Sequence, residues 1–140
     1  MKDKEKLEEI LAELKVYQEQ SEIIKQQIDT IRSTIAELDM LDETLDAIDG
    51  KEGAEIFVPI GAGSFALAEL KDTKNVIMSV GAGIAIKKSI KDAKSTLKKR
   101  RKELEKSVER LSKDLQKINE EISKLSPQAQ ELLKKVRGSE

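Results

Sequence analysis

Two segments of the chain repeat apolar residues at alternating spacings of three and four. In the first segment, ten of the twelve stripe positions from 7 to 45 are apolar, and the exceptions are Ser21 and Asp42. Near the end of this segment the stripe moves back one position, to Leu41, Leu45 and Ile48. Only a period close to 3.5 residues keeps such a stripe against a partner helix. The pattern therefore predicts a coiled-coil helix over residues 1–49.

The second segment predicts another coiled-coil helix over residues 87–140. Its stripe is unbroken from Leu104 to Val136 and thinner before Leu104. Pro127 follows Ser126 near the end. Two outcomes fit this pair, because proline kinks a helix interior but is favoured as the first residue of a new helix after a serine cap.

Between these segments lies a charge-poor stretch, Ile56 to Ile86, which contains four of the seven glycines. β-branched residues, alternation and glycine-containing turns predict two small β-hairpins within residues 50–86, with strands at 55–60, 65–71, 76–80 and 84–86. Pro59 lacks an N–H group, so its strand should lie at an edge or beside a bulge. Isolated hairpins are marginal in water, and open apolar edges pair with other chains. We therefore expect an assembly surface here.

Charge predicts how the two helices pair. Residues 37–55 carry eight acidic residues and one basic residue, whereas residues 87–102 carry nine basic residues and one acidic residue. Folding the chain back at the hairpins places these blocks side by side, whereas a parallel homodimer would oppose like charges. We expect an antiparallel hairpin with about 45 residues per arm, roughly 65–70 Å long. Leu7 should then lie near residue 127, so that both chain ends form one tip.

Composition narrows the function classes. Charged residues make up 38% of the 140 residues, aromatic residues 2%, and the formal net charge is −1. This composition is typical of long helices. The chain has no cysteine and no histidine, so it lacks thiolates and the commonest general base and metal ligand. It also has no secretory signal and no apolar run of about 18 residues. We expect a cytoplasmic protein that is not an enzyme and binds no cofactor, no metal and no membrane.

Two motifs suggest other ligands. Gly61, Gly63 and Ala66 match a relaxed dinucleotide-binding fingerprint, but the residues that follow alternate as in a strand rather than opening a helix. The basic block at residues 87–102 could bind nucleic acid, but it has no interleaved aromatic residues and an acidic block of similar size lies within the chain. We therefore expect hairpin turns and no nucleic acid partner.

The two chain ends hold more apolar residues than one helix pair needs, because Leu11 and Leu133 lie one position off the stripe. This pattern fits a broad core at a frayed end. It also fits an exposed apolar surface that binds another protein. The tip residues are Leu7, Ile10, Leu11, Leu14, Leu125, Ala129, Leu132, Leu133 and Val136.

Three motifs resemble archaeal prefoldin α subunits: VPIGAGSFALAELKDT at 58–73, VIMSVGAGIAIKK at 76–88 and LSPQAQELLKK at 125–135. The resemblance covers nearly the full chain. One departure is Ile84-Ala85-Ile86, where many relatives carry aromatic residues. The resemblance implies an α+β fold: a long antiparallel α-helical coiled-coil hairpin with two central β-hairpins that oligomerise into a β-barrel body.

The resemblance also implies a function. Two α subunits would self-associate through their hairpins and bind four prefoldin β subunits, and the tips of six coiled coils would hold non-native protein clients and pass them to a group II chaperonin without ATP. The tip residues would bind clients. Subunit assembly would use Ile56, Val58, Ile60, Phe65, Leu67, Val76, Met78, Val80 and Ile84. The alternative is a structural prefoldin-like scaffold or filament without client transfer.

Overall fold

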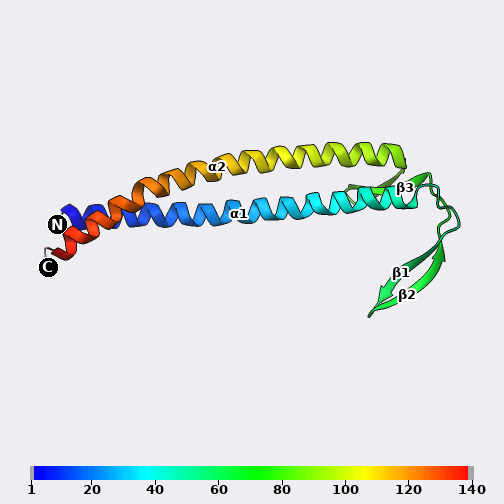
Figure 1. Ribbon diagram of the computed structural model, residues 1–140, viewed down its shortest axis with the longest axis horizontal. Helices are drawn as coiled ribbons and strands as arrows, with labels where there is room; N and C mark the ends of the chain where they lie inside the picture. The colour runs from blue at the N-terminus through cyan, green and yellow to red at the C-terminus, as the bar shows by residue number, and fades with distance from the viewer. Residues whose placement is uncertain (1, 139–140) are drawn as a thin grey trace. The chain divides into compact units, whose positions relative to one another are not determined.

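A computed structural model describes residues 2–138. Helix α1 spans Lys2–Ile48 and helix α2 spans Ile90–Gly138, and between them lie strands β1 (Glu55–Gly61), β2 (Ser64–Glu69), β3 (Asn75–Gly81) and β4 (Ile84–Ser89) (Figure 1). This confirms the predicted fold class of two long helices with two intervening β-hairpins. The described chain forms two compact units, which we call the terminal unit (residues 2–33 and 104–138) and the central unit (residues 34–103).

Burial along α1 in the terminal unit follows the heptad repeat. One set of stripe positions is buried and the alternate set is partly buried, while the residues between them are exposed. The buried set even includes Ser21, with 5% of its surface exposed. A helix that keeps one stripe covered over several turns is what a 3.5-residue period produces.

Helix α2 begins later than the pattern indicated. Strand β4 continues through Lys87 and Lys88 to Ser89, so the helix begins at Ile90 rather than at residue 87. The reason is local, because the Ser89 hydroxyl accepts a hydrogen bond from the N–H of Asp92 at 3.1 Å and thereby caps the first turn. At the other end, α2 continues as a helix through Pro127, so no new helix begins there.

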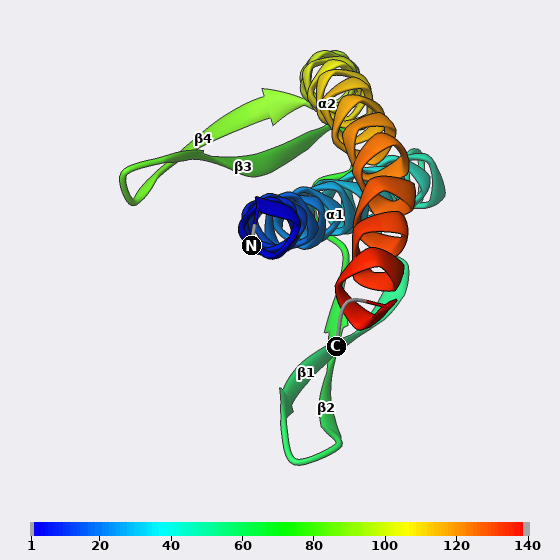
Figure 2. The ribbon, with the colours of Figure 1, turned by 90° about the vertical axis from the view of Figure 1, so that its left-hand side faces the viewer.

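The two hairpins have the same design. Each pairs two antiparallel strands, β1 with β2 and β3 with β4, and they project in different directions (Figure 2). Each has a two-residue turn, Ala62-Gly63 or Ala82-Gly83, with positive φ at both residues as a type I′ turn requires. Strand β1 is an edge of a two-stranded sheet, and its register shifts between Pro59 and Gly61, in agreement with the expectation that Pro59 lies at an edge or beside a bulge.

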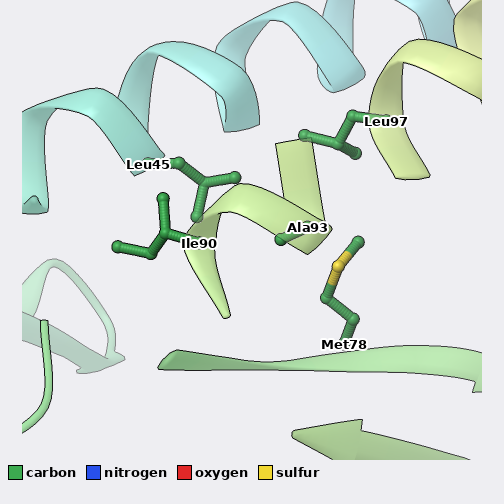
Figure 3. Close-up of a cluster of buried hydrophobic side chains, with 5 residues drawn as sticks. All are labelled: Leu45, Met78, Ile90, Ala93 and Leu97. Atoms are coloured by element: carbon green, nitrogen blue, oxygen red, sulfur yellow. The ribbon is translucent and has the colours of Figure 1, made fainter. Parts of the chain in front are cut away.

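The core of the central unit joins both helices to one hairpin. Leu45, Met78, Ile90, Ala93 and Leu97 form its buried cluster (Figure 3). The predicted shift of the α1 stripe to Leu41 is wrong, because Leu41 is 38% exposed whereas Asp42 is half-buried. Asp42 keeps the stripe position because its carboxylate pairs with Lys94 of α2 at 3.4 Å.

Candidate assembly surface and terminal cluster

The β1–β2 hairpin presents an exposed apolar face. Phe57 lies opposite Leu67 and next to the pair formed by Pro59 and Phe65. The two phenylalanine rings meet edge to face, with their centroids 6.5 Å apart. Even so, Phe57, Phe65 and Leu67 remain 66%, 59% and 68% exposed. Uncovered apolar surface of this kind is typical of an interface with another protein.

The β3–β4 hairpin has two different faces. One face packs on the helices through Met78, which is 7% exposed, with Val76 beside it. The other face carries Ile77, which is 75% exposed, whereas Ile84, which is 57% exposed, lies on the face of Met78 and Ile86 near the hairpin turn. The hairpin is therefore covered by the helices at Met78, while exposed apolar side chains remain on both of its faces.

The structure divides the nine predicted assembly residues into three groups. Met78 is buried within its own chain, Ile56 and Val76 are partly buried, and the exposed residues are Val58, Ile60, Phe65, Leu67, Val80 and Ile84. Sequence reasoning missed Phe57 and Ile77, because it assigned one apolar face to strands β1 and β3. A two-stranded hairpin has two faces, and this could have indicated that apolar residues on the second face, Phe57 and Ile77, were also candidates.

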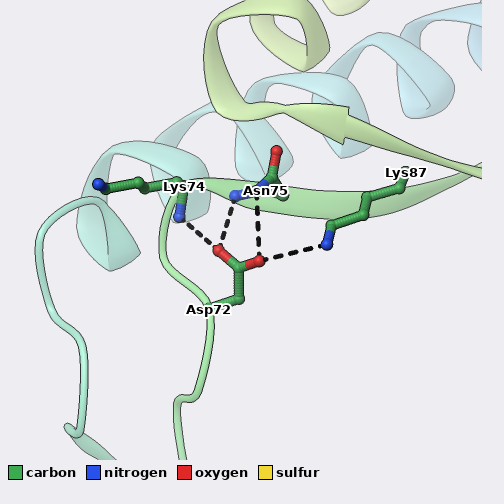
Figure 4. A network of polar contacts seen from close by, with 4 residues as sticks. All are labelled: Asp72, Lys74, Asn75 and Lys87. Carbon is green, nitrogen blue, oxygen red and sulfur yellow. Dashed lines mark hydrogen bonds and ion pairs between the residues drawn. The ribbon is translucent and has the colours of Figure 1, made fainter.

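The linker between the hairpins is fixed by Asp72 (Figure 4). Its Oδ1 accepts hydrogen bonds from the backbone N–H groups of Lys74 at 2.9 Å and Asn75 at 3.1 Å, and its Oδ2 accepts one from the Asn75 side chain at 3.3 Å. Lys87 of β4 lies 3.7 Å from the same carboxylate. The Lys74 N–H, followed by the Asn75 amide groups, lowers the pKa of Asp72. This Asx turn therefore sets the start of β3.

Ion pairs join the helices of the central unit. Lys94 pairs with Asp42 and Asp46, and Arg101 pairs with Asp39. The hydrogen bond to Asp46 is the main reason that the pKa of Lys94 is raised. These contacts place the acidic block of α1 against the basic block of α2 within one chain, as the antiparallel hairpin predicts.

In the terminal unit, a second apolar cluster joins α1 and α2; we call it the terminal cluster. Leu7, Leu14 and Ala129 are its buried members, and the partly buried residues around them are Ile10, Ile122, Leu125, Leu132 and Val136. Leu11 and Leu133 are not members of this cluster and are 50% and 39% exposed. The predicted tip residues thus comprise seven that pack together and two that remain open.

Two further apolar side chains of the terminal unit are exposed. Val16 and Ile23 of α1 are 51% and 55% exposed. Sequence reasoning overlooked them. The available signal was that they are apolar residues off the heptad stripe, on an otherwise polar face. Because they lie on a different side of α1 from Leu11, they are separate exposed apolar positions.

Within residues 2–138, no group of three or more acidic side chains is arranged to hold a metal ion. None of the helices in the described chain has a stretch that is apolar enough to span a membrane.

Two long helices with heptad-spaced burial, separated by two β-hairpins with exposed apolar side chains, define a coiled-coil protein with surfaces suited to assembly. The prefoldin subunit family model matches residues 17–135. The chain is 42% identical over 139 residues to prefoldin subunit alpha of Methanobrevibacter smithii, covering 99% of this chain and 95% of that protein. It is 41% identical over 101 residues to prefoldin subunit alpha 1 of Thermococcus kodakarensis, covering 71% and 69%.

Among solved structures, a chain of filamentous PFD from Methanocaldococcus jannaschii matches with a TM-score of 0.74 at 22% identity, covering 84% of this chain and 98% of that chain. This likeness shows the shared fold. The chain belongs to the prefoldin family of non-enzymatic chaperone subunits, and the archaeal relatives that it resembles are alpha subunits.

Proposed function

We propose that this chain is the α subunit of an ATP-independent holdase. Two copies associate through their hairpins and bind four β subunits, and the resulting complex holds non-native proteins for a group II chaperonin. The observation that carries the assembly step is the uncovered apolar surface of the hairpins at Phe57, Phe65, Leu67 and Ile77. Strands of other subunits would remove this surface from water, and apolar burial contributes about 25 cal/mol per Å².

Client holding is assigned to the exposed apolar residues of the terminal unit. Leu11 and Leu133 are available because they are about half exposed, whereas Leu7 and Leu14 are committed to the helix pair. Fully burying a leucine is worth about 1.5–3 kcal/mol, so a half-exposed leucine offers about 1 kcal/mol to a client. Contacts this weak need several subunits acting on one client, and multivalent binding supplies the avidity.

A double substitution, Leu11→Ser with Leu133→Ser, tests this assignment in the complex with the β subunits. Light scattering of a chemically denatured client should show reduced protection from aggregation. The matched control is Met40→Ser, because Met40 is 67% exposed on the same helix but lies in the central unit. Unchanged protection by the double variant, in a complex of unchanged mass, would overturn the role of these leucines.

The second candidate is a structural scaffold or filament. It is favoured by the open apolar faces on both hairpins, which could propagate assembly, and by the fold shared with a filamentous PFD chain. Measuring the mass of this chain alone and with a β subunit separates the two functions. A closed complex of defined mass supports the holdase, whereas polymers that grow with concentration support the filament.

A further inference from the structure

A short exposed link joins helix α1 to the first hairpin. The helix ends at Ile48, and Asp49 and Gly50 follow it in a turn, where both residues are exposed. Gly50 has a φ of 72°, the left-handed conformation that commonly ends a helix. Asp49 is the one aspartate of the chain that directly precedes a glycine. This pair of residues therefore differs from every other aspartate and its neighbour.

The Asp49 carboxylate is not held by other groups. Within residues 2–138 it forms no hydrogen bond and no ion pair. By contrast, Asp42 and Asp46 of the same helix both pair with Lys94. Asp72, which also lies outside the helices, accepts hydrogen bonds from the backbone N–H groups of the residues that follow it. The side chain of Asp49 is thus free to turn toward its own backbone.

The backbone beside Asp49 is equally open. No atom lies within 4 Å of the point where a Cβ of Gly50 would stand. Because glycine has no side chain, its nitrogen is accessible to the preceding carboxyl group. Helix ends also open at little cost in free energy, whereas the middle of a packed helix opens rarely. The link can therefore reach conformations in which the Gly50 nitrogen meets the Asp49 carboxyl carbon.

We propose that Asp49 is a site of spontaneous isomerisation to isoaspartate. The Gly50 nitrogen attacks Cγ of the protonated Asp49 carboxyl group. A C–N bond forms, the bond from Cγ to the hydroxyl oxygen breaks, and the hydroxyl leaves as water with the amide proton. Water then adds to the backbone carbonyl carbon of Asp49 in the cyclic imide, and the bond from that carbon to the Gly50 nitrogen breaks. One water is lost and one is gained, so the reaction needs no further reactant.

Isoaspartate lengthens the link by one main-chain atom, because the chain then runs through Cβ and Cγ of Asp49. The Lys51 N–H donates to the Ile48 carbonyl at 3.0 Å across this position. At the other end of the link, the Gly53 N–H donates to the Leu70 carbonyl at 2.8 Å and ties the link to the hairpin. The additional atom therefore changes how the β1–β2 hairpin is held at the end of α1. The isomerisation goes beyond the proposed function, and only its effect on assembly rests on that function.

Peptide mapping of the full-length chain tests the site. One tryptic peptide, residues 33–51, contains four aspartates: Asp39, Asp42, Asp46 and Asp49. The chain is kept at neutral pH and raised temperature, and electron-transfer fragmentation of this peptide locates isoaspartate over time. We expect isoaspartate to form at Asp49 at least about tenfold faster than at the three helical aspartates, because those must first open a packed helix.

Asp49→Glu is the matched control. It keeps the carboxylate, but its longer side chain would have to close a larger ring, so residue 49 of this variant should stay unchanged. A synthetic peptide of residues 45–54 gives the rate in the absence of the fold. Equal isoaspartate at the four aspartates, or none at Asp49 once the synthetic peptide has converted, would overturn the proposal.

The mass of the complex with β subunits tests the structural consequence. After ageing, the wild-type chain should form less complex than when fresh, whereas Asp49→Glu should form as much as before. Equal assembly of both aged chains, despite isoaspartate in the wild type, would refute the effect on the hairpin. Failure of the fresh wild-type chain to form a complex would instead contradict the proposed function, and it would leave the peptide-mapping result unaffected.

Discussion

Neighbouring residues of β3 provide the sharpest test of how the second hairpin is attached. Met78 packs in the core of the central unit and is 7% exposed, whereas Ile77 points the other way and is 75% exposed. Large-to-alanine substitutions in cores cost 2–5 kcal/mol, and the small cluster around Met78 places Met78→Ala near the lower limit, at about 2 kcal/mol. Ile77→Ala removes only about a quarter of the burial energy of an isoleucine, or about 0.5 kcal/mol.

Amide hydrogen exchange on the chain without partners measures these costs locally. Opening of the β3–β4 hairpin from the helices should speed exchange of its ladder amides about 30-fold in Met78→Ala and about twofold in Ile77→Ala. The two substitutions should have the opposite order of effect on association with other subunits. Ile77→Ala should weaken association more than Met78→Ala, because of these two side chains only Ile77 is exposed to a partner. Equal exchange rates in the two variants would refute the packing of β3 on the helix pair.

Further predictions concern single contacts. Ser89→Ala should destabilise the start of α2 by about 1 kcal/mol, measured by exchange of the first-turn amides. Ala82→Asn should stabilise its turn by about 0.5–1 kcal/mol, measured by exchange of the hairpin amides, because asparagine tolerates positive φ. The pKa of Asp72 is lowered in the folded chain, so the ionised carboxylate contributes fully to the free energy of unfolding above pH 3.8. This contribution is lost as pH falls through the lowered pKa. Thermal melts of Asp72→Asn should lack this acid dependence. The pKa of Lys94 is raised, so its stabilisation is present below pH 10.5 and lost as pH rises further; melts of Lys94→Met should lack this small alkaline component.

Much of the fold could be predicted because its elements are specified by local patterns. The heptad repeat places Leu7 and Leu14 in the seam, and the turns at Gly63 and Gly83 follow from the need for positive φ. The end of β4 was harder, since Lys87 and Lys88 suit a helix as well as a strand. The Ser89 cap decides the boundary, and a serine three residues before an aspartate was its signal.

The candidate surfaces were less predictable than the elements. The family resemblance assigned Met78 to subunit assembly, but Met78 packs in one cluster with Leu45 and Ala93 of its own chain. Alternation identifies the two faces of a strand, but it carries no information about which face a neighbouring helix will cover. The same limit applied to Phe57 and Ile77, whose exposure depends on what surrounds each hairpin.

The sequence by itself determined the elements, the antiparallel pairing of the helices and the two hairpins, because helical periodicity, charge blocks and turn chemistry act between residues whose positions are regular along the chain. Only the tertiary structure decided that Asp42 keeps a stripe position, that Met78 is buried, and that the Arg100 guanidinium donates a hydrogen bond to the Ser79 carbonyl of β3. Each of these depends on a contact with a side chain from a distant segment of the chain. The spacing of residues along one strand or helix does not specify such contacts.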